Sequence, residues 1–581
     1  MKSEGGQSRL PLAVGITATA ALGIVTVLAI TGALLSQVDE ISGERGGTLR
    51  VLAINQIGDL DPARLETAFD ASLLHATLRT PYAFQPERGI VSDLALGPAE
   101  ISEDSTRLEL TLRPDVRFGP PVDREVTADD FAYAIERSFL PSVDSPYARY
   151  YFRSIEGVGR FRRGKADTIS GLQTPDDETL VMSLEAPVAR TIAQALTLPM
   201  TAPVPREYAA RFDAKVTSDY ARHQVATGPY RFEPGADGLI PGLRSRRIAL
   251  VRNPSWDPET DFRPAFLDRI AVVPAPDQDV ATERLLVARD AVSGDFSASP
   301  HDLRRALEET PDQVHLTDAG IIRFVSLNTT SPPLDDVDVR RAVTAAFDQQ
   351  AARRALGGRV VGEIPTHWIP PGVPGFQEAG GAAGTGVDFL SYPSGNLGVA
   401  REYMRAAGYP SGRYEGDASL VAVGGDNSFS HDIKAPVRRA FRVLGIPIDI
   451  RIVSDERADD ICTTLATTPD LCLDGGWVKD FDDAVSILPP VFSAAAIRER
   501  NNVNYSLLDD EPVDQAMEEA SVTTGAADRA EKWADADRLL TAVAPAIPVA
   551  WFRYPLIRAA DVKGIVDNEL GRWDLTFTSL R

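Results

Sequence analysis

The sequence is poor in cysteine and in basic residues, and both shortages exclude classes of function. Only two cysteines and six histidines occur among 581 residues, and none has the C-x2-C or H-x3-H spacing of a zinc site. Lys and Arg number 60 against 83 Asp and Glu, which gives a net charge of -23. This balance argues against a nucleic-acid partner, because phosphate contacts need clustered basic side chains.

Catalytic and cofactor motifs are also missing. The chain contains no G-x-S-x-G elbow and no H-E-x-x-H, the patterns of common hydrolases. Gly157, Gly159 and Gly164 miss the spacing of a dinucleotide fingerprint. Acidic pairs such as Asp459-Asp460 and Asp482-Asp483 do not fit a calcium loop and are expected to be solvated turns. We therefore expect no enzyme activity, no cofactor and no metal.

A long uncharged run lies near the N-terminus. Leu10 to Val38 contains no charged residue, and it exceeds the roughly 20 helical residues that cross a bilayer core. Two basic residues precede the run and two acidic residues follow it, which predicts that the remainder is extracytoplasmic. We predict an uncleaved single-pass anchor and linker in residues 1–44. The alternative is a cleaved signal peptide, for which the run is long and offers only Thr31-Gly32-Ala33 as a cleavage-like site. No cysteine ends the run, so a lipid on an N-terminal cysteine is excluded.

The two cysteines lie close together in ICTTLATTPDLC, at Cys462 and Cys472. In an oxidising compartment a close, even pair is expected to form a disulfide. The alternative is two buried thiols.

Strand and helix patterns alternate along the chain. TLRVLAI (48–54) and IIRFVSLNTT (321–330) predict strands. VTADDFAYAIERSFL (126–140) predicts a helix with Thr127 as its N-cap, and VDVRRAVTAAFDQQAARRAL (337–356) predicts another single helix. Further on, residues 419–453 read strand, helix, strand, which is a beta-alpha-beta unit with parallel strands. Residues 513–543 predict a long helical stretch. Two α/β lobes with a cleft between them fit this layout.

The stretch GGWVKDFDDA (475–484) is the leading candidate for a binding site. Trp477 stands three residues before Asp480. A desolvated carboxylate can form a strong hydrogen bond to an ammonium, and a nearby indole face can stack on a ligand or attract its cation. The alternative is that Trp477 packs in the core and Asp480 caps a turn. Asn328, which ends a strand, and Tyr230, which follows a Gly-Pro turn, are further candidates, with a structural role as the alternative.

Nearly the whole chain after the anchor resembles the solute-binding proteins of ABC importers, in the large class of oligopeptide- and dipeptide-binding proteins. The resemblance rests on motifs in the family's order: GGTLRVLAINQIGDLDPA, LELTLRPDVRFGPPVDREVTADDFAYAIER, SPYARYYFRSIEGV, GLQTPDDETLVMSLEAP, ATGPYRF with LVRNPSWDP, LNTTSPPLDDVDVRRAVTAAFDQ, AREYMRAAGYP and GGWVKDFDDA.

The resemblance implies an α/β, two-lobed periplasmic-binding-protein-like fold of type II, with an extra subdomain inserted in lobe 1. By analogy, lobe 1 comprises residues 45–82, 196–323 and 553–581, the insertion comprises 83–195, and lobe 2 comprises 324–552. Closing two such lobes would bury a ligand, so its charges must find partners inside.

The resemblance also assigns ligand contacts. In similar peptide binders the aspartate of Gly-Trp-x-x-Asp holds the ligand's N-terminal ammonium, and this motif falls on Gly476, Trp477 and Asp480. Oligopeptide binders carry a carboxylate-binding arginine three residues before the tryptophan, where this chain has Asp474. A free ligand carboxylate therefore lacks its usual partner.

These observations predict a membrane-tethered, extracytoplasmic receptor that captures a peptide or other amino-bearing solute and delivers it to ABC permease subunits. A monomer without nucleic acid is expected. The alternative is a tethered solute sensor that signals to a regulatory partner.

Overall fold

The computed structural model describes residues 43–580 except 66, 86–87 and 242–244, and the side chains of 318–319 are also left out of the description. The predicted anchor, Leu10 to Val38, lies outside the described residues. Within them, no helix is both long and apolar enough to cross a membrane.

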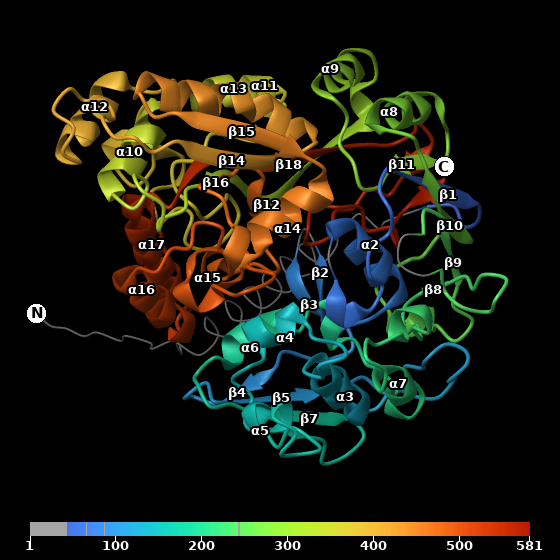
Figure 1. Ribbon diagram of the computed structural model, residues 1–581. Helices are drawn as coiled ribbons and strands as arrows, with labels where there is room; N and C mark the ends of the chain where they lie inside the picture. The colour runs from blue at the N-terminus through green and yellow to red at the C-terminus, as the bar shows by residue number, and fades with distance from the viewer. Residues whose placement is uncertain (1–42, 66, 86–87, 242–244, 581) are drawn as a thin grey trace, which may run out of the picture. The chain divides into compact units, whose positions relative to one another are not determined.

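Lobe 1 is built on a five-stranded mixed sheet with the order β11-β1-β10-β9-β8. The central strand β1 runs parallel to both of its neighbours, β10 and β11, whereas β9 is antiparallel to β10 and to β8. Its apolar residues, such as Leu49 and Val51, are fully buried. Helix α2 follows in the chain and lies beside the sheet (Figure 1). The bounds are β1 Thr48–Ala53, β8 Tyr230–Phe232, β9 Ile248–Arg252, β10 Arg269–Pro274, β11 Ala291–Ser293, α2 Ala68–Thr77, α8 Gln278–Val287 and α9 Pro300–Glu309.

The insertion forms its own layer, drawn in blue and cyan at the bottom of Figure 1. An antiparallel sheet with the order β4-β5-β7-β6 packs with helices. Helix α3 begins at a capping box, in which Thr127 and Asp130 satisfy each other's backbone amides, so the predicted N-cap is confirmed. The bounds are β4 Glu100–Ile101, β5 Arg107–Thr111, β6 Leu172–Gln173, β7 Thr179–Ser183, α3 Ala128–Ser138, α4 Pro146–Tyr151, α5 Val158–Arg162 and α6 Ala189–Ala195; the hairpin β2 Tyr82–Gln85 and β3 Gly89–Ser92 precedes them.

Lobe 2 contains two sheets. One is antiparallel, with the order β13-β18-β12-β17, and the other is parallel, with the order β15-β14-β16. Helix α13 connects β14 to its parallel neighbour β15, so the predicted beta-alpha-beta unit is confirmed. The bounds are β12 Val314–Ser326, β13 Gly362–Glu363, β14 Leu420–Gly425, β15 Ile448–Val453, β16 Leu471–Cys472, β17 Gly475–Val478, β18 Ala546–Ile557, α12 Leu397–Ala406, α13 Ser428–Val443, α14 Asp455–Thr463 and α15 Leu488–Phe492.

Two long strands join the lobes. The boundaries expected near residues 323 and 552 fall inside β12 and β18, which pair antiparallel from Val314↔Ile557 to Ser326↔Ala546. Just past β18, Arg558 bridges to Val292 of β11. The described part of the chain from Gly43 consequently forms one compact unit rather than separate domains.

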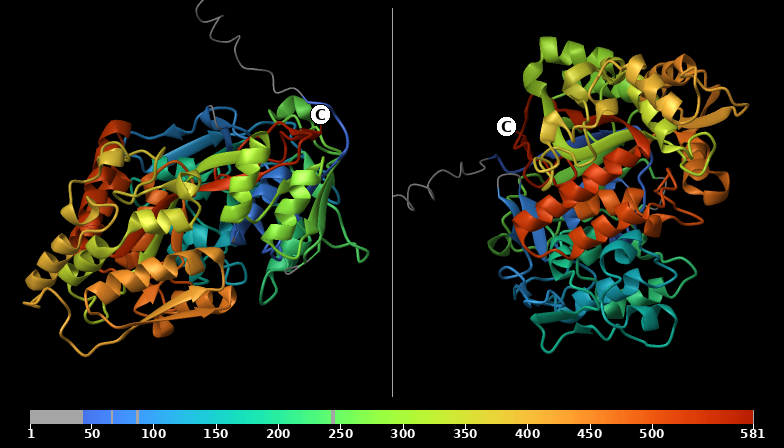
Figure 2. Two further views of the ribbon diagram at one scale, coloured as in Figure 1. Left: turned by 90° about the horizontal axis from the view of Figure 1, so that it is seen from above. Right: turned by 90° about the vertical axis from the view of Figure 1, so that its left-hand side faces the viewer.

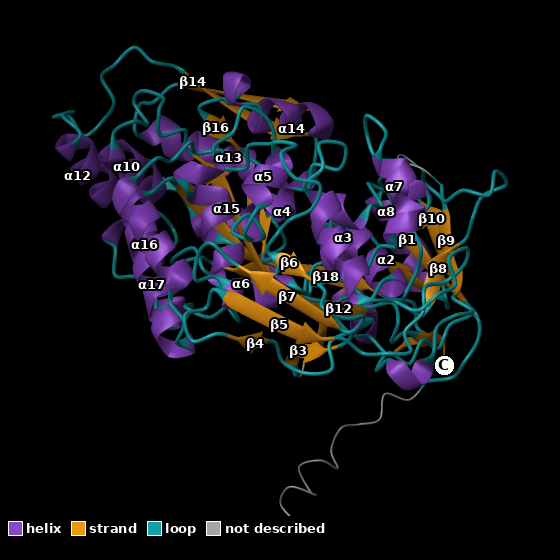
Figure 3. Cartoon of the chain, turned by 90° about the horizontal axis from the view of Figure 1, so that it is seen from below, coloured by secondary structure: helices purple, strands orange, loops and turns teal. Residues whose placement is uncertain are grey.

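One predicted helix is divided in the structure, and the predicted helical stretch consists of two helices. Residues 337–356 form α10 (Val337–Ala346) and α11 (Gln349–Ala355), because Asp348 accepts a hydrogen bond from Ala351 N and starts a new helix. The stretch 513–543 forms α16 (Glu511–Val522) and α17 (Ala526–Val543). In both cases a residue type that favours helix N-caps begins the second helix, Asp348 for α11 and Gly525 for α17. Figures 2 and 3 show the helices around the strands from other sides.

Candidate functional site

The Trp-x-x-Asp motif occupies β17, an edge strand of the antiparallel lobe 2 sheet, and the loop after it. Strand β17 pairs antiparallel with β12, so that Trp477 lies opposite Ile322 and Gly475 opposite Phe324. A Cβ atom at Gly475 would lie 2.5 Å from the Phe324 ring, closer than real Cβ contacts allow. Glycine at position 475 therefore allows β17 to pack closely against β12, and this packing sets the position of the loop that carries Asp480.

Asp480 is a buried carboxylate with neutral partners. Only 9% of the residue is exposed. The Tyr151 hydroxyl, from α4 of the insertion, donates to Asp480 Oδ2, and the Asp480 amide donates to Ser486 Oγ at 3.3 Å. In the described residues Asp480 forms no ion pair with a basic side chain. Burial raises the pKa of Asp480 to about 7, although the Tyr151 hydrogen bond lowers it.

The same loop fixes the indole of Trp477. Its Nε1 donates to the Ser486 carbonyl oxygen at 2.7 Å, while the Ser486 hydroxyl is within 2.8 Å of the carbonyl oxygens of Phe481 and Asp483. Trp477 is partly exposed and packs at the edge of the apolar core shared by the insertion and lobe 2. The hydrogen bonds of Ser486 therefore hold the Trp477 indole and the Asp480 backbone in fixed positions relative to each other.

The other two acids of the loop are already paired. Asp482 forms an ion pair with Lys479. Asp483 caps the following turn through Val485 N at 2.9 Å and binds Arg529 Nε at 2.7 Å. No group of three or more metal-ligating side chains occurs in the part of the chain that the structure describes.

Asn328 and Tyr230 make structural contacts instead of facing Asp480. Asn328 Oδ1 accepts bonds from Thr330 N at 3.0 Å and Thr330 Oγ1 at 2.7 Å, and Nδ2 donates to a backbone carbonyl. Tyr230 is fully buried in the lobe 1 core and donates to Leu267 O at 3.0 Å. In both residues the polar side-chain atoms form hydrogen bonds that stabilise the surrounding backbone.

Asp474, at the position of the expected arginine, is also a structural residue. Its two carboxylate oxygens accept bonds from Gly425 N at 2.5 Å and Ser430 Oγ at 2.7 Å, which fixes the turn between β14 and α13. Arg323 approaches Asp474 at 3.9 Å but lies over the Phe429 ring, 4.0 Å from its centroid.

The structure joins Cys462 and Cys472 in a disulfide. The bond connects α14 to β16, the strand just before β17. It therefore ties a peripheral helix to the parallel sheet, whose strand β16 directly precedes β17 in the chain.

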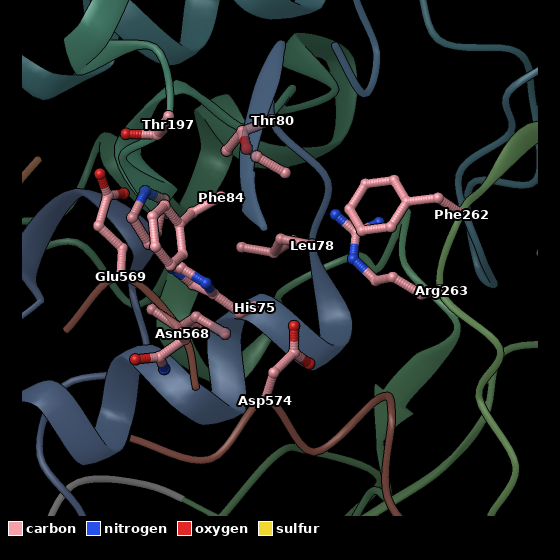
Figure 4. Close-up of a pocket in the computed structure, with 13 residues that line it drawn as sticks. His75, Leu78, Thr80, Phe84, Thr197, Phe262, Arg263, Asn568, Glu569 and Asp574 are labelled. Carbon is pink, nitrogen blue, oxygen red and sulfur yellow. The ribbon is translucent and has the colours of Figure 1, made fainter. Parts of the chain in front are cut away.

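The sequence reasoning missed two residues that meet this site. Tyr151 lies in the motif SPYARYYFRSIEGV, but the motif gives no sign that its hydroxyl contacts lobe 2. Glu569 lies in the C-terminal segment, in no recognised motif, and its pKa is raised to about 8, mainly by burial, with Asp482 and Asp480 adding to the shift. Figure 4 shows Glu569 in the wall of a pocket beside Phe84 and Thr197.

Comparison with known proteins agrees with this architecture. The model of the bacterial extracellular solute-binding proteins, family 5 Middle, matches residues 89–498. The chain belongs to this family. The periplasmic oligopeptide-binding protein OppA of Escherichia coli (strain K12) is 24% identical over 539 residues, covering 91% of this chain and 90% of the relative.

Binding proteins of known structure share the fold. Clavulanic acid biosynthesis oligopeptide binding protein 2 superposes with a TM-score of 0.80 at 26% identity, over 93% of this chain and 96% of the other. Haemophilus influenzae OppA in complex with RPPGFSPFR gives a TM-score of 0.70 at 18% identity, over 93% of this chain and 100% of the other. The two-lobed α/β fold is thus that of family 5 binding proteins.

Proposed function

We propose that this chain is the binding component of an ABC importer and that it captures a peptide or another amino-bearing solute between its lobes. Family membership supports a binding role. Curated relatives are described as binding oligopeptides, dipeptides, deoxycholate and heme. Because these ligands differ so much in chemistry, the choice of an amino-bearing ligand must rest on the residues of the site.

Asp480 is the observation that carries the proposal. A buried carboxylate is costly unless it is paired with a cation or protonated, and the described residues supply it with a phenol instead. A ligand ammonium would supply the missing positive charge and form a charge-assisted hydrogen bond. The fixed indole of Trp477 adds an aromatic face close by in the chain, suited to a cation or an apolar group.

The amino end of the ligand carries recognition in this proposal. The oxygens of Asp474 already accept bonds from Gly425 and Ser430, so this position offers no donor to a ligand carboxylate. Solutes with an amino group and no free carboxylate are therefore included in the ligand class.

Membrane attachment belongs to the same proposal. The uncharged run from Leu10 to Val38 is proposed to hold the protein at the membrane as an uncleaved anchor, with the binding unit outside the cytoplasm. Tethering would keep the receptor, as a monomer, close to its permease subunits and raise its effective concentration there.

Substitution of Asp480 tests the proposal. Native mass spectrometry of gently purified protein would identify a bound solute, and calorimetry with that solute would compare wild type with Asp480→Asn. We expect the variant to bind more weakly by about 2–5 kcal/mol, the range for losing one member of a buried charge pair. Asp509→Asn, at an exposed carboxylate, should bind like wild type. Unchanged affinity of a folded Asp480→Asn protein would refute the role of Asp480.

A further inference from the structure

Glu569 is a second buried carboxylate close to the Asp480 loop. Only 4% of the residue is exposed, and its Oε1 atom has no hydrogen-bond partner in the described part of the chain. Thr197 lines the same pocket, and its hydroxyl donates to Gln194 O at 2.9 Å. Leaving a buried carboxylate oxygen without a partner is unfavourable, so this atom requires an explanation.

The backbone around Glu569 is held in place by its neighbour Asn568. Asn568 Oδ1 accepts bonds from the amides of Leu570 and Arg572, each at 3.0 Å, and Nδ2 donates to Ser72 Oγ at 3.1 Å. Asn568 N also donates to Arg572 O at 2.7 Å. The turn is therefore fixed to α2, and Glu569 cannot easily withdraw its carboxylate toward solvent.

Glu569 lines a pocket with mixed walls, in which aliphatic side chains such as Leu74 and Leu78 stand beside aromatic and polar ones and a second carboxylate, Asp574. Phe84, Thr197, His75 and Asn568 surround the carboxylate side of the pocket (Figure 4). The cavity is small, about 20 Å³, and a cavity of roughly 10–15 Å³ by this measure suffices for one water. An ammonium group is similar in size to a water molecule, whereas a guanidinium is larger.

The basic residues near this pocket form their ion pairs with other acids. Lys479 pairs with Asp482, and its Nζ lies 5.5 Å from the Phe84 ring centroid. The charge of Lys479 also lowers the pKa of Glu569. Arg263 pairs with Asp93 and Asp261. His75 is uncharged at neutral pH, because burial and the charge of Arg263 lower its pKa to about 4. No ion pair to Glu569 occurs within the described ranges.

The pocket and the Asp480 loop are adjacent. Lys479 directly precedes Asp480 and reaches the ring of Phe84, which lines the pocket with Glu569. The charges of Asp480 and Glu569 also influence each other. The two carboxylates are therefore candidate partners for two cations of one ligand.

We propose that the Glu569 pocket binds a second, primary ammonium group of the ligand, and that the preferred solutes are diamino compounds such as peptides with a lysine side chain. This inference rests on the proposed function, since it needs a first amino group at Asp480. The first ammonium is held by Asp480 and the second by Glu569, with the Phe84 ring against the methylene chain.

A matched set of tripeptides tests this inference without changing the protein. Purified full-length protein is titrated with alanine tripeptides that carry lysine or norleucine at position 1, 2 or 3. Norleucine keeps the chain of lysine and lacks its amine. At one position we expect lysine to bind about tenfold or more tighter than norleucine, as for a hydrogen bond to a charged group.

Glu569→Gln should reduce that ratio to within about twofold while binding of the norleucine peptide is retained, and Glu308→Gln, at an exposed glutamate of α9, should leave the ratio unchanged. Equal affinities of lysine and norleucine peptides at all three positions of wild type would overturn the inference and leave the proposed function intact. A ratio that survives Glu569→Gln would place the second ammonium elsewhere. Failure of every peptide to bind would overturn both.

Discussion

At the scale of the residue, the unusual feature is a carboxylate kept in an unfavourable environment. Asp480 is supported by Tyr151, Ser486 and the β17 strand, and none of these brings a positive charge. Such an arrangement has a cost in the unliganded protein that ligand binding can remove. Under the proposals above, Asp480 and Glu569 both lower the stability of the unliganded protein and favour ligand binding.

This trade predicts a pH dependence of stability. The pKa of Asp480 is raised to about 7 by burial, against an ordinary value near 4 in the unfolded chain. The protonated form is thus favoured by folding, and its stabilisation is fully present below about pH 4 and lost as the pH rises through about 7. Asp480→Asn, which resembles the protonated acid, should raise the melting temperature of ligand-free protein at pH 8 and leave it nearly unchanged at pH 4.

Thermal unfolding of wild type, Asp480→Asn and the exposed control Asp509→Asn at both pH values checks this prediction. If Asp480→Asn changes the melting temperature equally at pH 4 and pH 8, burial does not destabilise the ionised form of Asp480.

Some of these residues could be singled out from the sequence and others could not. Trp477 and Asp480 are candidates because one local motif carries both, and their role in ligand binding stays a prediction. Tyr230 follows a turn and Asn328 follows a strand, and such positions do not distinguish a ligand contact from a structural one. Only the structure shows that their polar side-chain atoms form hydrogen bonds within the protein. The tyrosine hydroxyl on Asp480 depends on a pairing across more than 300 residues, Tyr151 with Asp480, which no local pattern encodes.

At the scale of the element, a buried ion pair fixes the loop that presents Asp480. Arg529 of α17 binds Asp483 Oδ2 at 2.7 Å and reaches Thr191 Oγ1 of α6 at 3.1 Å. One side chain thus connects a lobe 2 helix, the loop and the insertion. We expect Arg529→Met to destabilise the protein by about 3–5 kcal/mol, because it leaves Asp483 buried without its partner.

Chemical denaturation of Arg529→Met, Asp483→Asn and the double variant measures this effect. The double variant should lose less stability than the sum of the single variants. Additive losses would show that the two side chains act independently.

The disulfide makes a second prediction at this scale. Cys462 in α14 and Cys472 in β16 are bonded, and closing a loop of this length stabilises a protein by about 3 kcal/mol in the chain-entropy model. Peptide mapping without reduction should recover the two cysteines in one linked fragment. A reduced protein should unfold at lower denaturant concentration, and free alkylation of both thiols in the native protein would contradict the bond.

Helix and strand patterns predicted the type of most elements better than their limits. The beta-alpha-beta unit and the capped helix at Thr127 follow from local periodicity and capping, and both are confirmed. The division between α10 and α11 was missed, since the apolar stripe continues to Phe347 while Asp348 begins a new helix.

At the scale of the whole molecule, attachment of the binding unit to a membrane stays a prediction. The uncharged run from Leu10 to Val38 predicts that protein extracted from native membranes keeps its N-terminal peptide. Mass spectrometry of the intact chain checks this directly. A mature N-terminus near residue 34 would show that the run is a cleaved signal peptide.

The lobes and their joining strands were also partly predictable. An ordered series of motifs indicated the family and its two-lobed fold, because the motifs follow the order of its elements. The expected lobe boundaries fall within β12 and β18, since a strand that passes from one lobe to the next carries no composition change at the crossing.

The proposed capture of solutes by an amino group can be tested with a paired peptide library. Wild-type protein is dialysed to equilibrium against a random tripeptide library with free N-termini and against the same library after N-terminal acetylation, and the retained peptides are quantified by mass spectrometry. We expect the protein to retain peptides with a free N-terminal amine and to lose that retention when the N-termini are acetylated. Equal retention from both libraries, or retention from neither, would contradict it.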